Sequence, residues 1–187
     1  PAPAAATPTV SSESAVSAQA FGGGRTIAPG SWIEIFGQNL SNVTREWAGF
    51  DFMGANAPST LEGVRVMVAG RPAFVRFVSP GQVNAQVPEG IGMGPVNVTV
   101  TNSAGTSANI SMTAAARAPQ VLAPANFRIG ARQYAVATFA DGTTFVARPG
   151  EVAGITSRAA RSGDSITLYG VGFGAVLPAT AAGVVAA

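Results

Sequence analysis

The side chains that most enzymes use at neutral pH are missing from this chain. It has no His and no Cys, and all eleven of its basic residues are Arg. The chain therefore lacks the usual general base and the commonest metal ligand, as well as thiolate and amine nucleophiles. Nine carboxylates, two Tyr and hydroxyl groups remain, and no two carboxylates lie close together on one expected strand face. We expect no enzymatic activity, no metal and no cofactor.

The best candidates for ligand contact are three aromatic residues in one loop, residues 44–54. These residues are Trp47, Phe50 and Phe52. Aromatic rings on a loop at the end of a sandwich can stack on a sugar ring or anchor a protein partner. The alternative is that the loop folds back over the open end of the core, since apolar side chains on long loops usually bury themselves.

A second candidate is the basic segment 116–161, which has six Arg and two acidic residues. An anionic polysaccharide or the carboxylates of a partner could bind five Arg of this segment, which are Arg128, Arg132, Arg148, Arg158 and Arg161. Of these, Arg128 and Arg132 are the candidates for ligand contact. The alternative is a scatter of solvated charges. The net charge of the whole chain is only +2, and a surface that binds phosphates needs several clustered cations. We therefore expect no nucleic-acid partner.

The elements that would carry these residues are short strands. Apolar residues make up 47% of the chain and charged residues 11%, and the apolar residues recur in short blocks separated by Gly, Pro, Asn and Ser. This pattern is typical of an all-β protein. Alternating runs occur at "WIEIF" (32–36), "VRVMV" (64–68), "FVRFV" (74–78), "QVNAQV" (82–87) and "VNVTV" (96–100). They predict a β-sandwich from Ile27 to about Ala114.

Two hairpins are also predicted. In the first, the turn "AGRP" joins the runs 64–68 and 74–78, where Phe74, Arg76 and Val78 share one face and Val75 and Phe77 the other. In the second, "QYAVATFADGTTFVARPG" turns at "DG", residues 141 and 142, which is the strongest short-range turn signal in the chain.

The pattern of the first strand returns late in the sequence. The stretch "PGSWIEIFGQNL" (29–40) and the stretch "SGDSITLYGVGF" (162–173) match in residue type at six positions, each pair 133 residues apart. The pairs are Gly30 and Gly163, Ile33 and Ile166, Ile35 and Leu168, Phe36 and Tyr169, Gly37 and Gly170, and Leu40 and Phe173. Because the strands that follow the first copy have no counterpart after the second, we expect a second, incomplete β-sandwich unit.

The ordered motifs resemble those of a known family. The stretches "IAPGSWIEIFGQNLS", "LEGVRVMVAGRPAFVRFVSPGQVNAQVPEG" and "GPVNVTVTNSAGTSANISM" are similar to the IPT/TIG immunoglobulin-like domain. Residues 15–178 more closely resemble an uncharacterised C-terminal domain family of secreted Acidobacteria (Solibacter-type) proteins, whose members also carry "QYAVA.F.DGT", "RPGD" and "LYG.GFG.V.P". Ser162 stands here where that family has Pro. The resemblance implies an E-set-type sandwich and export from a bacterial cell, and it supplies no reaction.

These observations divide the chain into three parts. Residues 1–14 are expected to be an extended Pro/Ala/Ser/Thr linker or a mature N-terminus, residues 15–115 an IPT/TIG-like β-sandwich, and residues 116–187 a partial immunoglobulin-like unit. No run of 18 apolar residues exists, so we expect no membrane span.

The function expected from these observations is that of a non-catalytic module, secreted or on the cell surface, with a structural or adhesion-type role in protein interaction. An open sheet edge in the second unit could be covered by strand complementation, either by a protein partner or by self-association into oligomers, and Thr7–Phe21 is a candidate donor strand. The alternative is a carbohydrate-binding module of a secreted polysaccharide-active protein, with Trp47, Phe50 and Phe52 as its platform.

Overall fold

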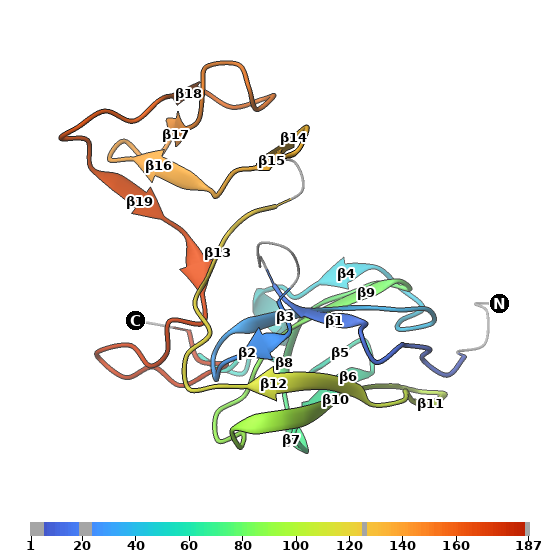
Figure 1. Cartoon of the computed structure of the whole chain (residues 1–187). Coiled ribbons are helices and arrows are strands. Elements are labelled where there is room, and N and C mark those ends of the chain that lie inside the picture. Colours follow the sequence, from blue (N-terminus) through green and yellow to red (C-terminus); the bar gives the residue numbers. More distant parts are fainter. Residues whose placement is uncertain (1–5, 19–23, 125–126, 186–187) are drawn as a thin grey trace.

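The computed structural model describes residues 6–18, 24–124 and 127–185 of the chain (Figure 1). Its regular elements are short strands together with one turn of 3-10 helix, η1 (Gly49–Asp51). Nothing in the described part is a helix of the length and apolar character that crossing a membrane requires. The chain is therefore all-β, as predicted.

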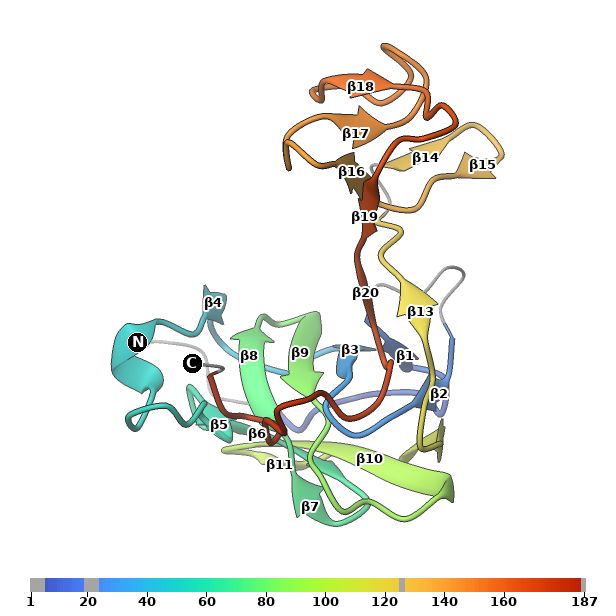
Figure 2. The ribbon, with the colours of Figure 1, turned by 90° about the vertical axis from the view of Figure 1, so that its left-hand side faces the viewer.

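Two sheets form the first unit, and they pack face to face (Figures 1 and 2). The first sheet has the order β1 (Ala15–Ser17), β3 (Trp32–Phe36), β9 (Gln82–Gln86), β8 (Phe74–Val78) and β4 (Arg45–Glu46). The second sheet has the order β2 (Thr26–Ile27), β12 (Ile110–Ala114), β10 (Gly94–Asn102), β6 (Val64–Val68) and β5 (Thr60–Leu61), with β7 (Arg71–Pro72) beside β6 and β11 (Gly105–Thr106) beside β10.

The core lies between these sheets and is built from alternate positions of their strands. Ile33 and Ile35 of β3 are fully buried, whereas Phe36 is exposed. The same alternation buries Val83 and Ala85 of β9. The facing sheet contributes Val64, Val66, Val68, Val96, Val98, Val100, Ile110 and Met112. Burial of alternate residues on two facing sheets makes this unit a β-sandwich, which confirms the prediction.

The predicted hairpin over residues 64–78 is only half right. Strand β6 pairs with the short β7, and the turn between them places Ala69 and Gly70 at φ 50° and 74°. The chain then crosses to the other sheet, where β8 pairs with β9 and β4. The two runs therefore lie in opposite sheets.

The predicted alternation along β8 is wrong at its centre. A register shift separates Val75 from Phe77 in the pairing with β9. A bulge of this kind adds one residue to a strand and turns the side chains that follow it to the opposite face. As a result Val75 and Val78 are both buried and Arg76 is exposed.

Strands β14–β19 build the second unit, and β13 and β20 lead into it and out of it. A four-stranded sheet has the order β18 (Ser157–Arg158), β17 (Phe145–Val146), β16 (Ala137–Phe139) and β19 (Ile166–Leu168). Beside it lie the hairpin of β14 (Arg128–Ile129) with β15 (Arg132–Gln133) and the pair of β13 (Gln120–Val121) with β20 (Gly170–Val171). A small core of its own contains Phe127, Val136, Ala147 and Val152.

The predicted turn at residues 141 and 142 is confirmed. Strands β16 and β17 pair antiparallel on either side of it. Asp141 Oδ1 accepts the backbone N–H groups of Thr143 (3.0 Å) and Thr144 (2.9 Å), and Gly142 has φ 69°.

A two-stranded ribbon links the two units. Strands β13 and β20 lie side by side between the first sandwich and the second unit (Figures 1 and 2). After β20 the chain returns to the first sandwich. There the N–H of Ala57 donates to the carbonyl of Gly183 (2.7 Å), and the N–H of Gly183 donates to Gln86 Oε1 (2.8 Å).

The internal repeat is also a structural repeat. The turn from Ala28 to Ser31 and the turn from Arg161 to Asp164 each close with a backbone bond from the fourth residue to the first, of 3.0 Å and 3.1 Å. In each turn a side-chain oxygen of the fourth residue accepts the N–H of the first, at 3.1 Å and 2.7 Å. The third residues, Gly30 and Gly163, have φ 75° and 90°.

The N-terminal segment contributes to the first sandwich. Thr9 exchanges two backbone hydrogen bonds of 2.9 Å with Gln38, and Val10 packs against the core. Within the expected donor strand Thr7–Phe21, residues 15–17 form β1 and pair with β3, while residues 19–21 lie outside the described residues.

Candidate interaction site

The three aromatic residues of the loop 44–54 do not form one flat platform. The Trp47 ring packs edge-on against Trp32 (5.7 Å between centroids) and Phe52 (4.9 Å), and Trp47 also lies against the core. Phe50, in contrast, is 80% exposed. The structure therefore brings Trp47 and Phe52 together in a half-buried cluster and leaves Phe50 in solvent, beside the guanidinium of Arg45.

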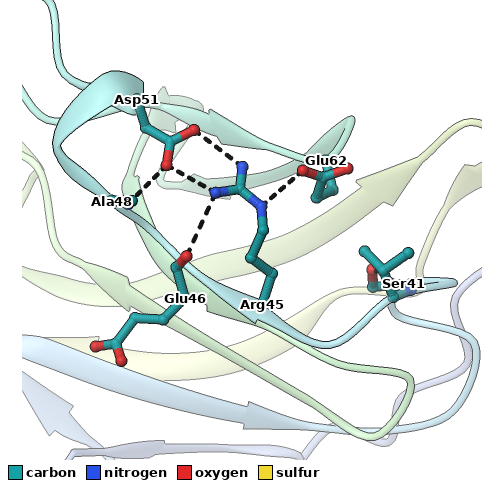
Figure 3. A network of polar contacts seen from close by, with 7 residues as sticks. Ser41, Arg45, Glu46, Ala48, Asp51 and Glu62 are labelled. Carbon is teal, nitrogen blue, oxygen red and sulfur yellow. Dashed lines mark hydrogen bonds and ion pairs between the residues drawn. The ribbon is translucent and has the colours of Figure 1, made fainter.

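A network centred on Arg45 holds this loop in place (Figure 3). Its guanidinium donates to both oxygens of Asp51 (2.8 and 2.9 Å), and its Nε donates to Glu62 Oε1 (2.7 Å). Asp51 Oδ2 also accepts the backbone N–H of Ala48 (2.7 Å). The hydrogen bonds from Arg45, followed by that from Ala48, lower the pKa of Asp51 below its ordinary value, so the carboxylate remains charged at neutral pH.

Sequence reasoning did not find this network, although one local signal was present. An acidic residue three positions after the start of a short helical turn often accepts the N–H at that start. Ala48 and Asp51 have this spacing around η1. The contacts to Glu62 come from tertiary structure and leave no local pattern.

The two Arg residues expected to contact a ligand lie on the β14–β15 hairpin. Arg128 is opposite Gln133, and Arg132 is opposite Ile129. Residues directly opposite each other share a face, and neighbours along a strand alternate between faces. Arg128 and Arg132 are exposed, and they therefore project from opposite faces of the hairpin.

A different Arg is fixed by contacts in this unit. Arg158 donates to both oxygens of Asp164 (2.7 and 2.9 Å), and its guanidinium lies 3.5 Å from the ring centroid of Phe139. These hydrogen bonds, together with the N–H of Arg161, lower the pKa of Asp164 to about 2. The pair fastens the turn that precedes β19 to β18, the strand at the opposite end of the same sheet.

Strand β19 has an unpaired edge. It forms the end of its sheet and pairs with β16 alone among residues 6–18, 24–124 and 127–185. The N–H of Tyr169 donates to Val136 on the paired side. Backbone groups alternate in direction along an antiparallel strand. The N–H and C=O groups of Ile166 and Leu168 therefore point toward the unpaired edge.

The same strand exposes apolar side chains. Ile166 is 45% exposed and Leu168 is 57% exposed, whereas their counterparts Ile33 and Ile35 are fully buried. Phe173, the counterpart of the buried Leu40, is 61% exposed. We define the open edge as Ile166–Leu168 together with these exposed side chains. It combines unsatisfied backbone groups with apolar surface, the two features that a strand from a partner can cover.

Two observations on the described residues concern metal binding and hydrolysis. They contain no group of three or more Asp, Glu, His or Cys that could hold a metal. A cavity of about 490 Å³ lies between the first sandwich and residues 172–184, and Glu89 is the single carboxylate among its described lining residues. A lone carboxylate cannot supply the acid and base pair that glycoside hydrolysis requires.

Comparison with known proteins agrees with the fold of the first unit. No curated protein matches the chain. The family model of the IPT/TIG domain matches residues 24–114, which are the residues from just before β2 to the end of β12.

Proposed function

We propose, from the match of residues 24–114 to the family model of the IPT/TIG domain, that this chain is a non-catalytic interaction module with a structural or adhesion role. It assembles with other protein chains, copies of itself included, by strand complementation at the open edge. The observation that carries the proposal is the contrast between the buried Ile35 and the 57% exposed Leu168 at matching positions.

In the part of the chain that the structure describes, the open edge has none of the features that normally protect a strand from pairing. Proteins blunt such edges with charged residues, Pro or a covering segment. The strand reads Ile166-Thr167-Leu168 and contains neither a charge nor a Pro. Its neighbour Tyr169 is also uncharged and is 42% exposed. These properties favour pairing with a strand from another chain.

We propose further that the module acts outside the cell, in the medium or on the cell surface. The resemblance to a family of secreted bacterial proteins supports this location. Cell fractionation of the native protein tests it: we expect the protein in the medium or on the outer surface, and recovery in the cytosol alone would contradict the proposal.

The mass of the purified chain in solution tests self-assembly. Sedimentation velocity over a range of concentrations should show oligomers that grow with concentration. Leu168→Asp places a charge at the open edge and should shift the chain to monomer. Leu177→Asp is the matched control, because it makes the same change at a side chain that is 97% exposed and lies outside β19. A wild-type chain that is monomeric at every concentration would refute self-assembly.

Carbohydrate binding is the second candidate function. The observation that favours it is the exposed Phe50 ring, with the Arg45 guanidinium carbon 5.5 Å from its centroid. A glycan array tests it. Binding that disappears in Phe50→Ala, with the circular dichroism spectrum unchanged, would support this function, and no binding to neutral or acidic glycans would exclude it.

A further inference from the structure

We infer that the open edge of β19 accepts, from a partner polypeptide, an antiparallel strand with the chemistry of β9: small apolar residues alternating with uncharged amides. This inference rests on the proposed function and deepens it, because it specifies the orientation, the hydrogen-bonding positions and the residue types of the partner strand. The template is inside the molecule, where the first copy of the same strand is already paired.

In the first sandwich, β9 occupies the edge of β3 opposite β1. Ile33 lies opposite Ala85, and Ile35 lies opposite Val83. Backbone hydrogen bonds flank these pairs, from Gly37 N–H to Gly81 (3.0 Å) and between residues 87 and 31 (2.8 Å). Because hydrogen-bonded pairs alternate along an antiparallel ladder, Val83 and Ala85 direct their backbone groups toward β3, and the residue between them points away.

In the second unit, β16 pairs with β19 as β1 pairs with β3 in the first sandwich. In the first sandwich Ala15 lies opposite Ile35 and Ser17 lies opposite Ile33. In the second unit Ala137 lies opposite Leu168 and Phe139 lies opposite Ile166. Strand β16 therefore takes the place of β1. The place that corresponds to β9 is the unpaired side of β19.

Local contacts beyond the strand show that the two copies share one backbone path. A Cβ on Gly37 would lie 2.5 Å from the carbonyl oxygen of Thr9, and a Cβ on Gly170 would lie 2.5 Å from that of Gln120. Two residues further along, Asn39 and its counterpart Gly172 both have positive φ, 57° and 77°. The register of β9 on β3 can therefore be transferred to β19.

The side chains of β9 set the chemistry of the partner strand. Val83 and Ala85 are fully buried on the core face, and Gln82, Asn84 and Gln86 lie on the other face. Transferred to β19, a small apolar residue lies beside Leu168 and another beside Ile166. Neither β9 nor the segment 165–171 contains a charged residue, so the pairing should depend little on salt.

The chain's own β9 is not free to fill this place. It lies between β3 and β8 in the middle of its sheet, and its Val83 and Ala85 are part of the first core. Moving it would open the first sandwich. The place beside β19 therefore remains open to a strand from a separate polypeptide.

A peptide with the sequence of residues 81–88, GQVNAQVP, tests the inference against the full chain. Fluorescence anisotropy of the labelled peptide should show saturable binding below about 1 mM. N-methylation at Ala85 removes an N–H that points toward the acceptor strand and should weaken binding about tenfold or more. N-methylation at Asn84 is the matched control, since that N–H points away from the acceptor, and it should leave the affinity unchanged.

Variants of the chain locate the binding to the open edge. Leu168→Asp should abolish peptide binding, and Leu177→Asp, the same change at an exposed side chain outside β19, should preserve it. Both positions are exposed, so both variants are expected to fold, as thermal denaturation will verify. Binding that both N-methylated peptides reduce equally, or that Leu168→Asp leaves intact, would overturn the inference.

The same experiment separates this inference from the proposed function. If the chain forms oligomers and the peptide releases monomers from them, both are supported. If oligomers form and no peptide binds, self-assembly holds and the inference falls. If a monomeric chain binds the peptide at the open edge, the inference holds and self-assembly falls. If a monomeric chain binds no peptide, both are refuted.

Discussion

Ile35 and Leu168 occupy the same position in two copies of one strand, yet the first is fully buried and the second is 57% exposed. Truncation should therefore have unequal effects. Ile35→Ala should lower the free energy of unfolding by about 2–5 kcal/mol, because it leaves a cavity between two sheets. Leu168→Ala should change it by less than about 0.5 kcal/mol. Urea denaturation at low protein concentration measures both, and equal losses would show that Leu168 is buried in solution.

Glycine at position 37 is required by a close approach of two backbones. A Cβ there would lie 2.5 Å from the Thr9 carbonyl oxygen, so Gly37→Ala should cost about 1–3 kcal/mol and release the N-terminal segment from the sheet edge. Gly49→Ala is the control, because no atom lies within 4 Å of that Cβ. Thermal denaturation compares the two. A stable Gly37→Ala variant would mean that residues 9 and 10 are not held against the first sandwich.

The ion pair between Arg45 and Asp51 should matter more than the neighbouring pair with Glu62. Asp51 accepts two hydrogen bonds from Arg45 and one from Ala48, whereas Glu62 accepts one. Asp51→Asn should therefore lower the melting temperature further than Glu62→Gln does. The difference should persist in high salt, because salt screens partly buried charges less than exposed ones, and the side chain of Asp51 is only 13% exposed whereas that of Glu62 is 40% exposed. The reverse order would contradict the network in Figure 3.

Acid should weaken the second unit. The ordinary pKa of an Asp side chain is 3.8. Hydrogen bonds from the N–H and hydroxyl of Thr144 and the N–H of Thr143 lower the pKa of Asp141 to about 2. Hydrogen bonds from Arg158 and from the N–H of Arg161 lower the pKa of Asp164 to about 2. A lowered folded-state pKa contributes stability that is present above the ordinary value and is lost as the pH falls through the lowered one. Melting temperatures should therefore drop between pH 4 and pH 2.

The control for the acid experiment is Asp164→Asn. This variant should melt lower than the wild type at pH 6, and the gap should narrow toward pH 2, where the wild-type carboxylate is itself protonated. A gap that stays constant over this range would show that Asp164 does not titrate with a lowered pKa.

The sequence correctly predicted the strands in which apolar and polar residues alternate regularly. Alternation gave the buried faces of β3, β6, β9 and β10 correctly, because one residue in two faces the core of a sandwich. It failed at β8, where a bulge after Val75 changes the period. It also failed to show that β6 and β8 lie in opposite sheets, because sheet membership depends on contacts that are distant in the sequence.

The interaction site was less accessible to sequence reasoning. The repeat over residues 162–173 gave the existence of a second copy of the strand, since glycines and apolar residues recur at fixed spacing. The network of Arg45 joins Asp51 and Glu62, 6 and 17 residues away along the chain, and only the folded chain shows it. The sequence also could not show that Phe50 is the exposed ring of the three. Trp47, Phe50 and Phe52 are all aromatic, and only their packing in the folded chain distinguishes them.

The ribbon of β13 and β20 has a mechanical consequence. The second unit begins and ends on the first sandwich, through β13 on one side and through the contacts of Gly183 with Ala57 and Gln86 on the other. A domain that is connected to its neighbour at two places rotates less freely than a domain on a single linker. A pulling force applied to the open edge is thus divided between β13 and the segment that follows β20, and it reaches the first sandwich at two separate places. An assembly of such chains would transmit tension through paired strands instead of through flexible linkers.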